Sequence, residues 1–162
     1  MEQIDIDEID IQILNALQSD ATVSNQALAA TANISPPTCL RRVKRLRDAG
    51  LIEREVALLS PDKLASITGH GLTAIVEITL DRQGDEHLSA FELRITKSAA
   101  VQQCYRTSPG PDFVLIVHVS DMPAYLALGQ QVFTSDANVR NVKAFFSIKR
   151  SKFEPKFELK VL

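Results

Sequence analysis

The most concentrated group of chemically active residues in this sequence is a basic run between positions 41 and 47. The run holds five bases and no acid: Arg41, Arg42, Lys44, Arg45 and Arg47. The first twenty residues hold six acids and no base. Because the whole chain has 18 Lys+Arg against 20 Asp+Glu and a net charge of -2, the run predicts a local anion site, not a general attraction to polyanions. A solvated helix face is the alternative interpretation.

The residues that most often perform catalysis or bind metals are scattered. His70, His87 and His118 are far apart, and none has a Cys or His partner at ligand spacing. Cys39 is expected to be a small core residue, and Cys104 a buried structural thiol with no base nearby. A Gly-rich phosphate loop and a nucleophile elbow are absent from the sequence. The sequence therefore predicts no enzyme, no metal site and no cofactor.

Length and composition indicate a globular protein. A chain of 162 residues forms one domain or two small ones, and 45% hydrophobic with 23% charged residues excludes a disordered or collagen-like chain. Neither a run of 18 apolar residues nor a basic secretory n-region is present. Two cysteines are too few for a disulfide framework. We therefore expect a cytoplasmic protein that has no membrane partner.

Three helices are predicted to position the basic run. The first covers residues 7–18, because apolar residues recur there at helical spacing. The second begins at Ser24, a favourable N-cap, and ends at Asn33, which tolerates the left-handed conformation. The third begins at the pair Ser35-Pro36 and stops at Gly50. Residues 51–59 are expected to form a short two-stranded wing or a connector.

The third helix has two different faces. An apolar arc is expected to face the core: Cys39, Leu40, Val43 and Leu46. The opposite arc is polar or basic: Pro37, Thr38, Arg41, Lys44 and Arg45. Two helices joined by a short turn after a supporting helix form a helix-turn-helix, whose second helix enters the DNA major groove.

The chemistry of the basic run fits double-stranded DNA. Arginine makes bidentate contacts to guanine, Lys and Arg neutralise phosphates, and a helix N-terminus offers free N–H groups. We place the motif at residues 25–44. The expected DNA-binding residues are Ser24, Asn25, Ser35, Pro36, Thr38, Arg41, Arg42, Lys44 and Arg45.

The rest of the chain predicts a βαββαβ domain. Strands are expected at residues 72–80, 100–107, 113–120 and 139–149, and helices at 85–97 and 122–135. This order folds as a ferredoxin-like sheet with both helices on one face. The inward residues would be Leu88, Phe91 and Ile95 on the first helix, and Met122, Leu126, Gly129 and Phe133 on the second.

The expected fold class is therefore α+β, an N-terminal winged helix-turn-helix followed by a C-terminal ferredoxin-like domain. We expect the DNA-binding domain at residues 1–60, a linker at 61–71, the ferredoxin-like domain at 72–150 and a tail at 151–162. The tail is basic and irregular, and it would form a final strand or an exchange arm.

The alternation within the strands predicts a second subunit. Val114, Ile116 and His118 would lie on one face of their strand, and Phe113, Leu115, Val117 and Val119 on the other. Both faces of the sheet are therefore apolar, and a partner chain most simply covers the second one. A homodimer also supplies the symmetry that reads a palindromic site. An RNA-binding sheet is the rival interpretation, but the aromatic-basic-glycine run that it needs is absent from the sequence.

The chain resembles the leucine-responsive regulatory protein (Lrp)/AsnC family of bacterial and archaeal transcription regulators. The matching segments follow in order over nearly the whole chain: residues 9–14, 35–46, 50–52, 57–61, 76–80 and 119–125. The resemblance implies homodimers that assemble into a tetramer or octamer. It also implies an amino acid effector, leucine or methionine, that binds between dimers and shifts assembly and DNA affinity. A family member that does not respond to an amino acid is the alternative.

In the family, the turn between the two middle strands and the facing last strand line the effector pocket. The resemblance implies these effector-binding residues: Ser108, Pro109, Gly110, Pro111, Asp112, Phe113, Met122, Phe145, Phe146 and Ser147. Asp112 and the turn backbone would hold the α-amino group, and Met122 with the two phenylalanines would hold an apolar side chain. The glycine here comes one place later than in the family, and Pro111 replaces an aromatic residue. An ordinary hairpin turn, in which Asp112 is a capping residue, is the alternative.

Overall fold

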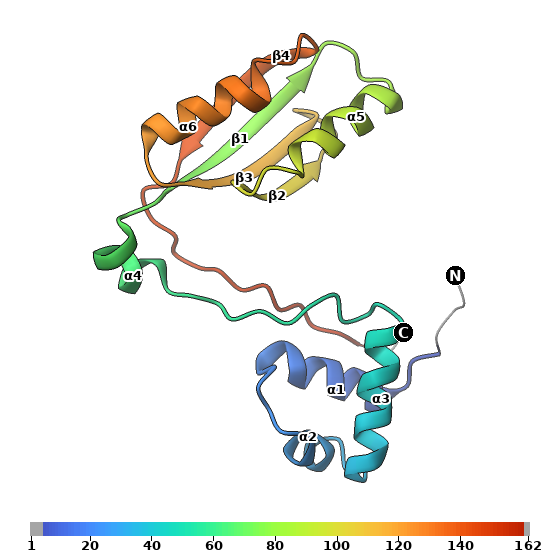
Figure 1. The fold of residues 1–162 in the computed structure, drawn as a ribbon. Coiled ribbons are helices and arrows are strands. Elements are labelled where there is room, and N and C mark those ends of the chain that lie inside the picture. Colours follow the sequence, from blue (N-terminus) through green and yellow to red (C-terminus); the bar gives the residue numbers. More distant parts are fainter. Residues whose placement is uncertain (1–4, 161–162) are drawn as a thin grey trace. The chain divides into compact units, whose positions relative to one another are not determined.

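The computed structural model describes residues 5–160, which divide into two compact units (Figure 1). The first unit comprises the residues up to Leu58 together with the C-terminal segment from Lys152, and the second spans Leu59–Ser151. Within the described residues, a helix with the length and apolar character needed to cross a membrane is not found.

The first unit contains three helices, as predicted: α1 (Glu8–Ser19), α2 (Asn25–Thr31) and α3 (Pro36–Asp48). Each begins at a side-chain cap. The Asp7 carboxylate accepts a hydrogen bond from the Asp10 backbone N–H at 2.9 Å. The hydroxyls of Ser24 and Ser35 cap α2 and α3 in the same way, and Pro36 occupies the first turn of α3. These caps satisfy N–H groups that would otherwise lack partners, so the sequence determines where each helix starts.

The core of the first unit lies between the three helices. Its buried apolar residues are Ile13, Leu14, Leu28, Ala29, Ala32, Cys39, Val43 and Leu46. Leu40, predicted to face this core, is instead 60% exposed. Cys39, Val43 and Leu46 already form a narrow seam at i, i+4 and i+7, and Leu40 lies about 100° away from Cys39 around the helix. The stops are as predicted, because Asn33 has φ 52° and Gly50 has φ 74°.

The connection between the two units differs from the sequence-based expectation. Residues 51–60 contain no strand, so of the two alternatives, wing and connector, the structure forms the connector. An isolated two-strand ribbon is at best marginal in water. The expected irregular linker contains a helix, α4 (Pro61–Thr68), which Ser60 caps and Gly69 ends with φ 78°.

The second unit is built on a four-stranded antiparallel sheet in the order β2-β3-β1-β4. Its strands are β1 (Leu72–Leu80), β2 (Val101–Arg106), β3 (Phe113–Val119) and β4 (Val139–Phe146). This order is that of a ferredoxin-like sheet, which confirms the predicted fold. Each strand lies within its predicted range, and β4 ends three residues earlier than predicted because Ser147 makes the last main-chain contact, to Thr73 at 2.9 Å.

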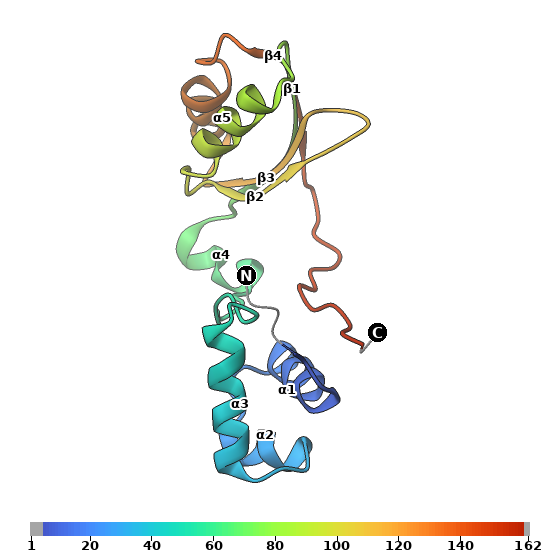
Figure 2. The ribbon, with the colours of Figure 1, turned by 90° about the vertical axis from the view of Figure 1, so that its right-hand side faces the viewer.

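Two helices cover one face of the sheet (Figures 1 and 2). They are α5 (Asp85–Ile95) and α6 (Met122–Leu128), and α6 continues as a π-helical turn, η1 (Gly129–Phe133). On α5 the predicted inward residues Phe91 and Ile95 are buried, and Leu88 packs against the same core.

The inward face of α6 is not the predicted one. Met122 is 42% exposed and Leu126 is 59% exposed, whereas Tyr125, Leu128 and Val132 face the core. Tyr125, Leu128 and Val132 recur at i, i+3 and i+7, so the buried stripe is an ordinary helical one that lies one position before the predicted stripe. The predicted contact of Phe133 is nevertheless present, because that ring is buried.

Candidate DNA interface and effector-binding loop

The outward face of α3 presents cationic and polar side chains beside a capped N-terminus. Arg41 is exposed and makes no hydrogen bond or ion pair with any described residue. Lys44 is 78% exposed and lies 3.5 Å from Asp48, one helical turn later. Such exposed ion pairs are weak, so Lys44 can readily leave Asp48 and bind another anion. Arg41 and Lys44 are therefore available to an external polyanion.

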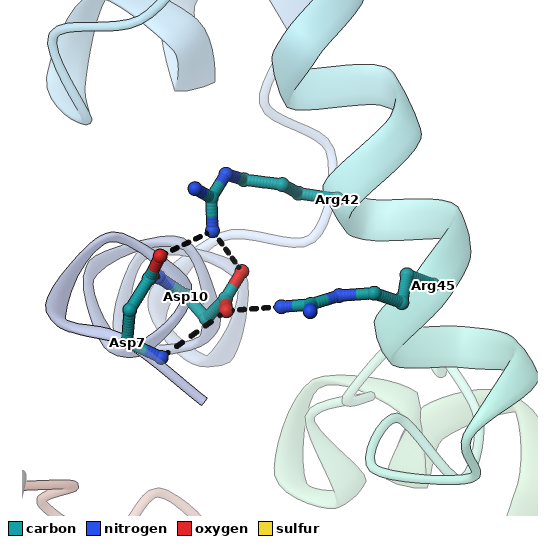
Figure 3. A network of polar contacts seen from close by, with 4 residues as sticks. All are labelled: Asp7, Asp10, Arg42 and Arg45. Atoms are coloured by element: carbon teal, nitrogen blue, oxygen red, sulfur yellow. Dashed lines mark hydrogen bonds and ion pairs between the residues drawn. The ribbon is translucent and has the colours of Figure 1, made fainter. Parts of the chain in front are cut away.

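Two other predicted DNA-contacting residues, Arg42 and Arg45, turn toward α1 instead. Arg42 Nη1 donates to Asp10 Oδ1 at 3.0 Å and to Asp7 Oδ2 at 2.8 Å. Arg45 Nη2 donates to Asp10 Oδ2. Figure 3 shows both guanidinium groups reaching from α3 to the start of α1. In this structure they join two helices, which differs from the expectation that they face outward with Arg41.

The reason for this inward turn is Asp10, which sequence analysis did not single out. Its side chain is fully buried, and a buried carboxylate is costly unless it is paired and hydrogen-bonded. Asp10 Oδ2 also accepts from the Asp7 backbone N–H at 3.3 Å, which closes the capping box of α1. The signal in the sequence is an acid three residues after an N-cap acid, placed among isoleucines.

The electrostatics of this cluster favour the charged forms of Asp7 and Arg42. The pKa of Asp7 lies below its ordinary value of 3.8, first because the Asp10 backbone N–H donates to its carboxylate and then because Arg42 lies beside it. Hydrogen bonds to Asp10 and Asp7 raise the pKa of Arg42. The cluster formed by Asp7, Asp10, Arg42 and Arg45 is hereafter called the α1–α3 ion pair.

The remaining predicted DNA-binding residues shape the turn before α3. Asn25 Nδ2 donates to the Pro36 carbonyl oxygen at 2.9 Å, which ties α2 to the first turn of α3. The Ser35 and Thr38 hydroxyls lie 2.8 Å apart. Ser24 caps α2, as described above. Together these contacts fix the direction in which α3 leaves the turn, while Ser35 and Pro36 remain exposed at its tip.

The predicted effector turn, residues 108–113, lies between β2 and β3. Asp112 Oδ2 accepts from the Leu80 backbone N–H at 2.7 Å and from Gln83 Nε2 at 3.2 Å. Its carboxylate therefore caps the end of β1, which is the alternative role weighed from the sequence. Phe113 is fully buried and packs on Phe91 at 4.9 Å between ring centroids, so it is a core residue. Gly110 has φ 128°, a conformation that favours glycine.

The apolar residues predicted for the same pocket lie elsewhere. Phe145 and Phe146 are on opposite faces of β4, as alternation requires. Phe146 packs edge-on against Tyr125 at 5.0 Å, whereas Lys143 Nζ lies 4.7 Å over the Phe145 ring. Phe146 pairs with the start of β1, and the residues of the turn contact its far end.

Met122 and Ser147 also lie at the β1-start end of the sheet. Met122 opens α6 directly after β3, whose last residue pairs with Leu72, and the Ser147 backbone N–H donates to Thr73. Within one chain, the turn and this apolar group therefore do not form one site. A pocket lined by both would need residues from more than one chain.

A hollow does lie beside the turn. It is lined by Gln83, Leu88, Arg106, Thr107, Ser108 and Asp112. Two of the lining residues, Arg106 and Asp112, are charged, and Arg106 also donates to Asp85 at 2.8 Å and to Glu92 at 3.1 Å. Sequence analysis missed Gln83 and Arg106, because both belong to other segments that only the folded sheet brings to the turn.

The structure does not lower the pKa of either cysteine thiol. Burial raises the pKa of both thiols, Cys39 and Cys104, which disfavours the reactive thiolate. A group of three or more His, Cys, Asp or Glu side chains placed to hold a metal ion is not found among residues 5–160.

A helix-turn-helix unit with a basic third helix, followed by a ferredoxin-like unit, defines a DNA-binding transcription regulator with a ligand-binding domain. The family model for winged helix-turn-helix DNA-binding matches residues 6–53, and the model for the Lrp/AsnC ligand binding domain matches residues 73–157. The chain belongs to the Lrp/AsnC family. Because this is a family of transcription regulators, the protein is not an enzyme.

Individual relatives agree with this assignment. The chain is 39% identical to the leucine-responsive regulatory protein of Escherichia coli strain K12 over 124 residues, which cover 76% of this chain and 73% of that protein. It is 35% identical to an uncharacterized HTH-type transcriptional regulator of Haemophilus influenzae over 141 residues, 87% of this chain and 82% of that one.

Solved structures agree as well. A transcriptional regulator from Neisseria meningitidis, in complex with L-Met, matches with a TM-score of 0.80 and 28% identity over 96% of this chain and 97% of that one. An AsnC family transcriptional regulator from Agrobacterium tumefaciens matches with a TM-score of 0.80 and 30% identity over 94% of this chain and 96% of that one.

Proposed function

We propose that the protein reads double-stranded DNA with Thr38, Arg41 and Lys44 of α3. The observation that supports this proposal most directly is the contrast between neighbours: Arg41 has no partner among the described residues, while Arg42 is bound to Asp10. A free guanidinium on a fixed helix is suited to bidentate contact with guanine in the major groove. Lys44, further along the same face, is suited to a phosphate.

The other predicted DNA-binding residues divide into two groups in this proposal. Ser24, Asn25, Ser35 and Pro36 orient the start of α3 on the DNA backbone. Arg42 and Arg45 are positioning residues that act through Asp10 to hold α3 against α1. They contribute to the local positive potential, but base recognition falls to the residues that remain free.

We infer that the sheet face opposite α5 and α6 is where two copies meet. This face presents Ile75, Tyr105 and Phe145 with 40%, 53% and 44% of their surfaces exposed. Half-exposed apolar residues on one sheet face favour burial against a second copy. A homodimer provides two α3 helices for a palindromic site, and dimers would assemble further into a tetramer or octamer.

We propose that an amino acid, leucine or methionine, is the effector of the second unit. The hollow beside the turn places Arg106 and Asp112 around one space, and a zwitterion carries both complementary charges. The relative from Neisseria meningitidis was solved with L-Met. The apolar group at Met122, Phe145 and Phe146 would come from another chain of the assembly. By linkage, an effector that favours one assembly shifts DNA affinity if the assemblies bind DNA differently.

The DNA proposal is tested by binding to duplex DNA and single-stranded RNA across a salt series. We expect duplex preference, loss of affinity with rising salt, and a strong loss in Arg41→Ala/Lys44→Ala. Lys63→Ala, which removes a cation from the exposed face of α4, is the matched control and should bind like the parent. RNA preference, or equal binding by the double variant, would contradict the proposal. A protein that acts on chromosomal DNA in this way is expected in the cytoplasm.

The effector proposal is tested by thermal shift with the twenty amino acids, followed by sizing chromatography and DNA binding with any hit. A ligand of the folded state raises the melting temperature. We expect L-leucine or L-methionine to do so and the D-enantiomer to have no effect. If stability, assembly and DNA affinity all stay constant at millimolar amino acid, the alternative of a regulator without an amino acid response is correct.

A further inference from the structure

The side chains of α1 make a second set of contacts that the DNA-binding function does not use. Asn15 Nδ2 donates to the Leu159 carbonyl oxygen at 3.2 Å, and the Leu159 N–H donates to Asn15 Oδ1 at 3.4 Å. Gln18 repeats the pattern one turn later: its Nε2 donates to the Phe157 carbonyl at 3.1 Å, and the Phe157 N–H donates to its Oε1 at 3.1 Å. Each amide thus satisfies both backbone groups of one residue.

In this pattern, side-chain amides take the place of the backbone groups of a neighbouring β-strand. In an extended chain, residues i and i+2 direct their N–H and C=O groups to the same side, and a neighbouring strand exchanges both bonds with each of them. Asn15 and Gln18 lie three residues apart on one helix face, so they replace two residues of such a neighbour. The face is therefore built for an extended peptide.

Two further contacts set the register of the bound peptide. The Leu159 side chain is half-buried and packs against the core of the first unit. Lys156 Nζ donates to Ser19 Oγ at 2.7 Å, at the end of α1. Phe157, between them, remains 66% exposed. One apolar anchor and one cationic anchor separated by three positions make the contact specific to this segment.

The position of the segment in the chain gives the contact a consequence. The first unit is linked to the second twice, after Leu58 and before Lys152. Both links leave the sheet from adjacent strands at the same end, because Ala74 near the start of β1 pairs with Phe146 at the end of β4. A docked C-terminal segment therefore adds a second covalent connection between the two units.

We propose that α1 has a docking surface, formed by Asn15, Gln18 and Ser19, for an extended peptide. Its occupant is this chain's own C-terminal segment, residues 156–160. The docked segment acts as a second tether that restricts how the helix-turn-helix unit reorients on the ferredoxin-like unit. A helix-turn-helix unit that is already restricted loses less orientational freedom when the two copies in a dimer each bind one half-site. Docking therefore raises the affinity for a duplex with two half-sites. This last step rests on the proposed DNA-binding function.

The docking is tested without DNA by hydrogen exchange of the full chain. In the parent we expect the N–H groups of Phe157 and Leu159 to exchange about tenfold or more slowly than unprotected amides. Asn15→Ala/Gln18→Ala should abolish this protection, while Gln12→Ala, an exposed amide on the same helix, should retain it. Exchange of both groups at unprotected rates in the parent would overturn the proposal.

A substitution in the C-terminal segment tests the same contact without altering α1. Phe157→Pro removes the N–H that Gln18 accepts and leaves the helix unchanged. We expect the Leu159 amide to lose protection in this variant while the amides of Ile13 and Leu46, in the core, keep theirs. Unchanged Leu159 protection would show that the paired amides do not hold the segment, and would overturn the proposal.

The tether role is tested by comparing duplexes with one and two half-sites. Asn15→Ala/Gln18→Ala should bind the two-half-site duplex about three- to tenfold more weakly, with single-site affinity unchanged. Equal affinity of variant and parent for the two-half-site duplex would overturn the tether role. If the parent itself binds neither duplex, the proposed DNA function fails, which the hydrogen-exchange result distinguishes from failure of the docking.

Discussion

Asp10 of α1 and Arg42 of α3, which are 32 positions apart, are joined by a hydrogen bond of 3.0 Å with the carboxylate fully buried. A buried carboxylate needs compensating donors. In the α1–α3 ion pair both cationic donors to Asp10, Arg42 and Arg45, belong to α3. The basic helix α3 is therefore oriented by charge as well as by its apolar seam. Because of this contact Arg42 is bound to Asp10, while its neighbour in sequence, Arg41, stays free.

Removal of the Asp10 charge should destabilise the first unit. In Asp10→Asn, Arg42 and Arg45 keep at most one acceptor of the former carboxylate, but both guanidinium groups are partly exposed and turn to water. We expect the free energy of unfolding to fall by on the order of 2 kcal/mol, less than for a fully buried pair. Urea unfolding followed by far-UV circular dichroism measures this change.

The matched control for this prediction is Asp48→Asn. Asp48 also pairs with a cation of α3, Lys44, but both side chains are exposed, at 66% and 78%. An exposed i,i+4 pair contributes about 0.3–0.5 kcal/mol. If Asp10→Asn costs no more than Asp48→Asn, the buried pair does not hold α3 in place.

Arg41 and Arg42 should respond to alanine in opposite ways. Arg41→Ala should leave the urea midpoint unchanged and weaken duplex binding, with a salt slope about one unit smaller if the residue neutralises a phosphate, or about 1–3 kcal/mol less discrimination if it contacts a base. Arg42→Ala should lower the midpoint and weaken binding mainly through stability. Together, urea unfolding and duplex binding distinguish a residue that contacts DNA from one that positions α3. Equal loss of stability in both variants would contradict the division.

The caps and the sheet of this protein could be predicted from sequence because their causes are local. Ser35-Pro36 favours an N-cap followed by the first turn of a helix, and α3 begins there. The strands followed from continuous runs that are apolar on both faces. Ser60-Pro61 carries the same local signal and begins α4, but the neighbouring glycines favoured an irregular linker instead.

The candidate site was less predictable because its determinants are not local. A helical wheel places Arg41, Arg42 and Arg45 by angle alone, and the burial of Asp10 on another helix decides which of them turns inward. The predicted effector residues do not come together within one chain for a similar reason. Alternation puts Phe145 and Phe146 on opposite faces, and the pairing register puts the turn at the far end of β1 from both.

Stability at acid pH should report the Asp7 cap. The pKa of Asp7 is below 3.8, first because of the Asp10 backbone N–H and then because of Arg42. A group with a lower pKa when folded adds stability above its unfolded pKa and loses it as the pH falls through the folded one.

Asp7→Asn isolates this contribution, because asparagine still caps a helix but does not ionise. The stability difference between parent and Asp7→Asn should be constant above about pH 5 and should shrink as the pH falls below 3.8. Urea midpoints of the two proteins at several pH values measure it. A difference that does not depend on pH would mean that the ionised carboxylate adds no stability.

Gly71 should be intolerant of a side chain for a steric reason. A Cβ at this position would lie 2.4 Å from the Cε1 and Nε2 atoms of the His118 ring and 3.2 Å from the Val119 carbonyl oxygen. The ring is also held by Thr73, whose Oγ1 lies 3.0 Å from its Nδ1. Gly71→Ala must therefore displace the ring and break this hydrogen bond, so we expect a loss of about 1–3 kcal/mol in the second unit.

A double variant identifies the ring as the obstacle. Both tyrosines lie in the second unit and the chain has no tryptophan, so tyrosine fluorescence during urea unfolding reports this unit alone. Adding Gly71→Ala to His118→Ala should cost much less than adding it to the parent, because the displaced ring is then absent. Gly129→Ala, whose Cβ would meet only Phe133 at 3.8 Å in a helical turn, should be neutral or stabilising. If the cost of Gly71→Ala is the same with and without the imidazole, the close approach to Val119 or the backbone of Gly71 itself is responsible, and the steric role of His118 is wrong.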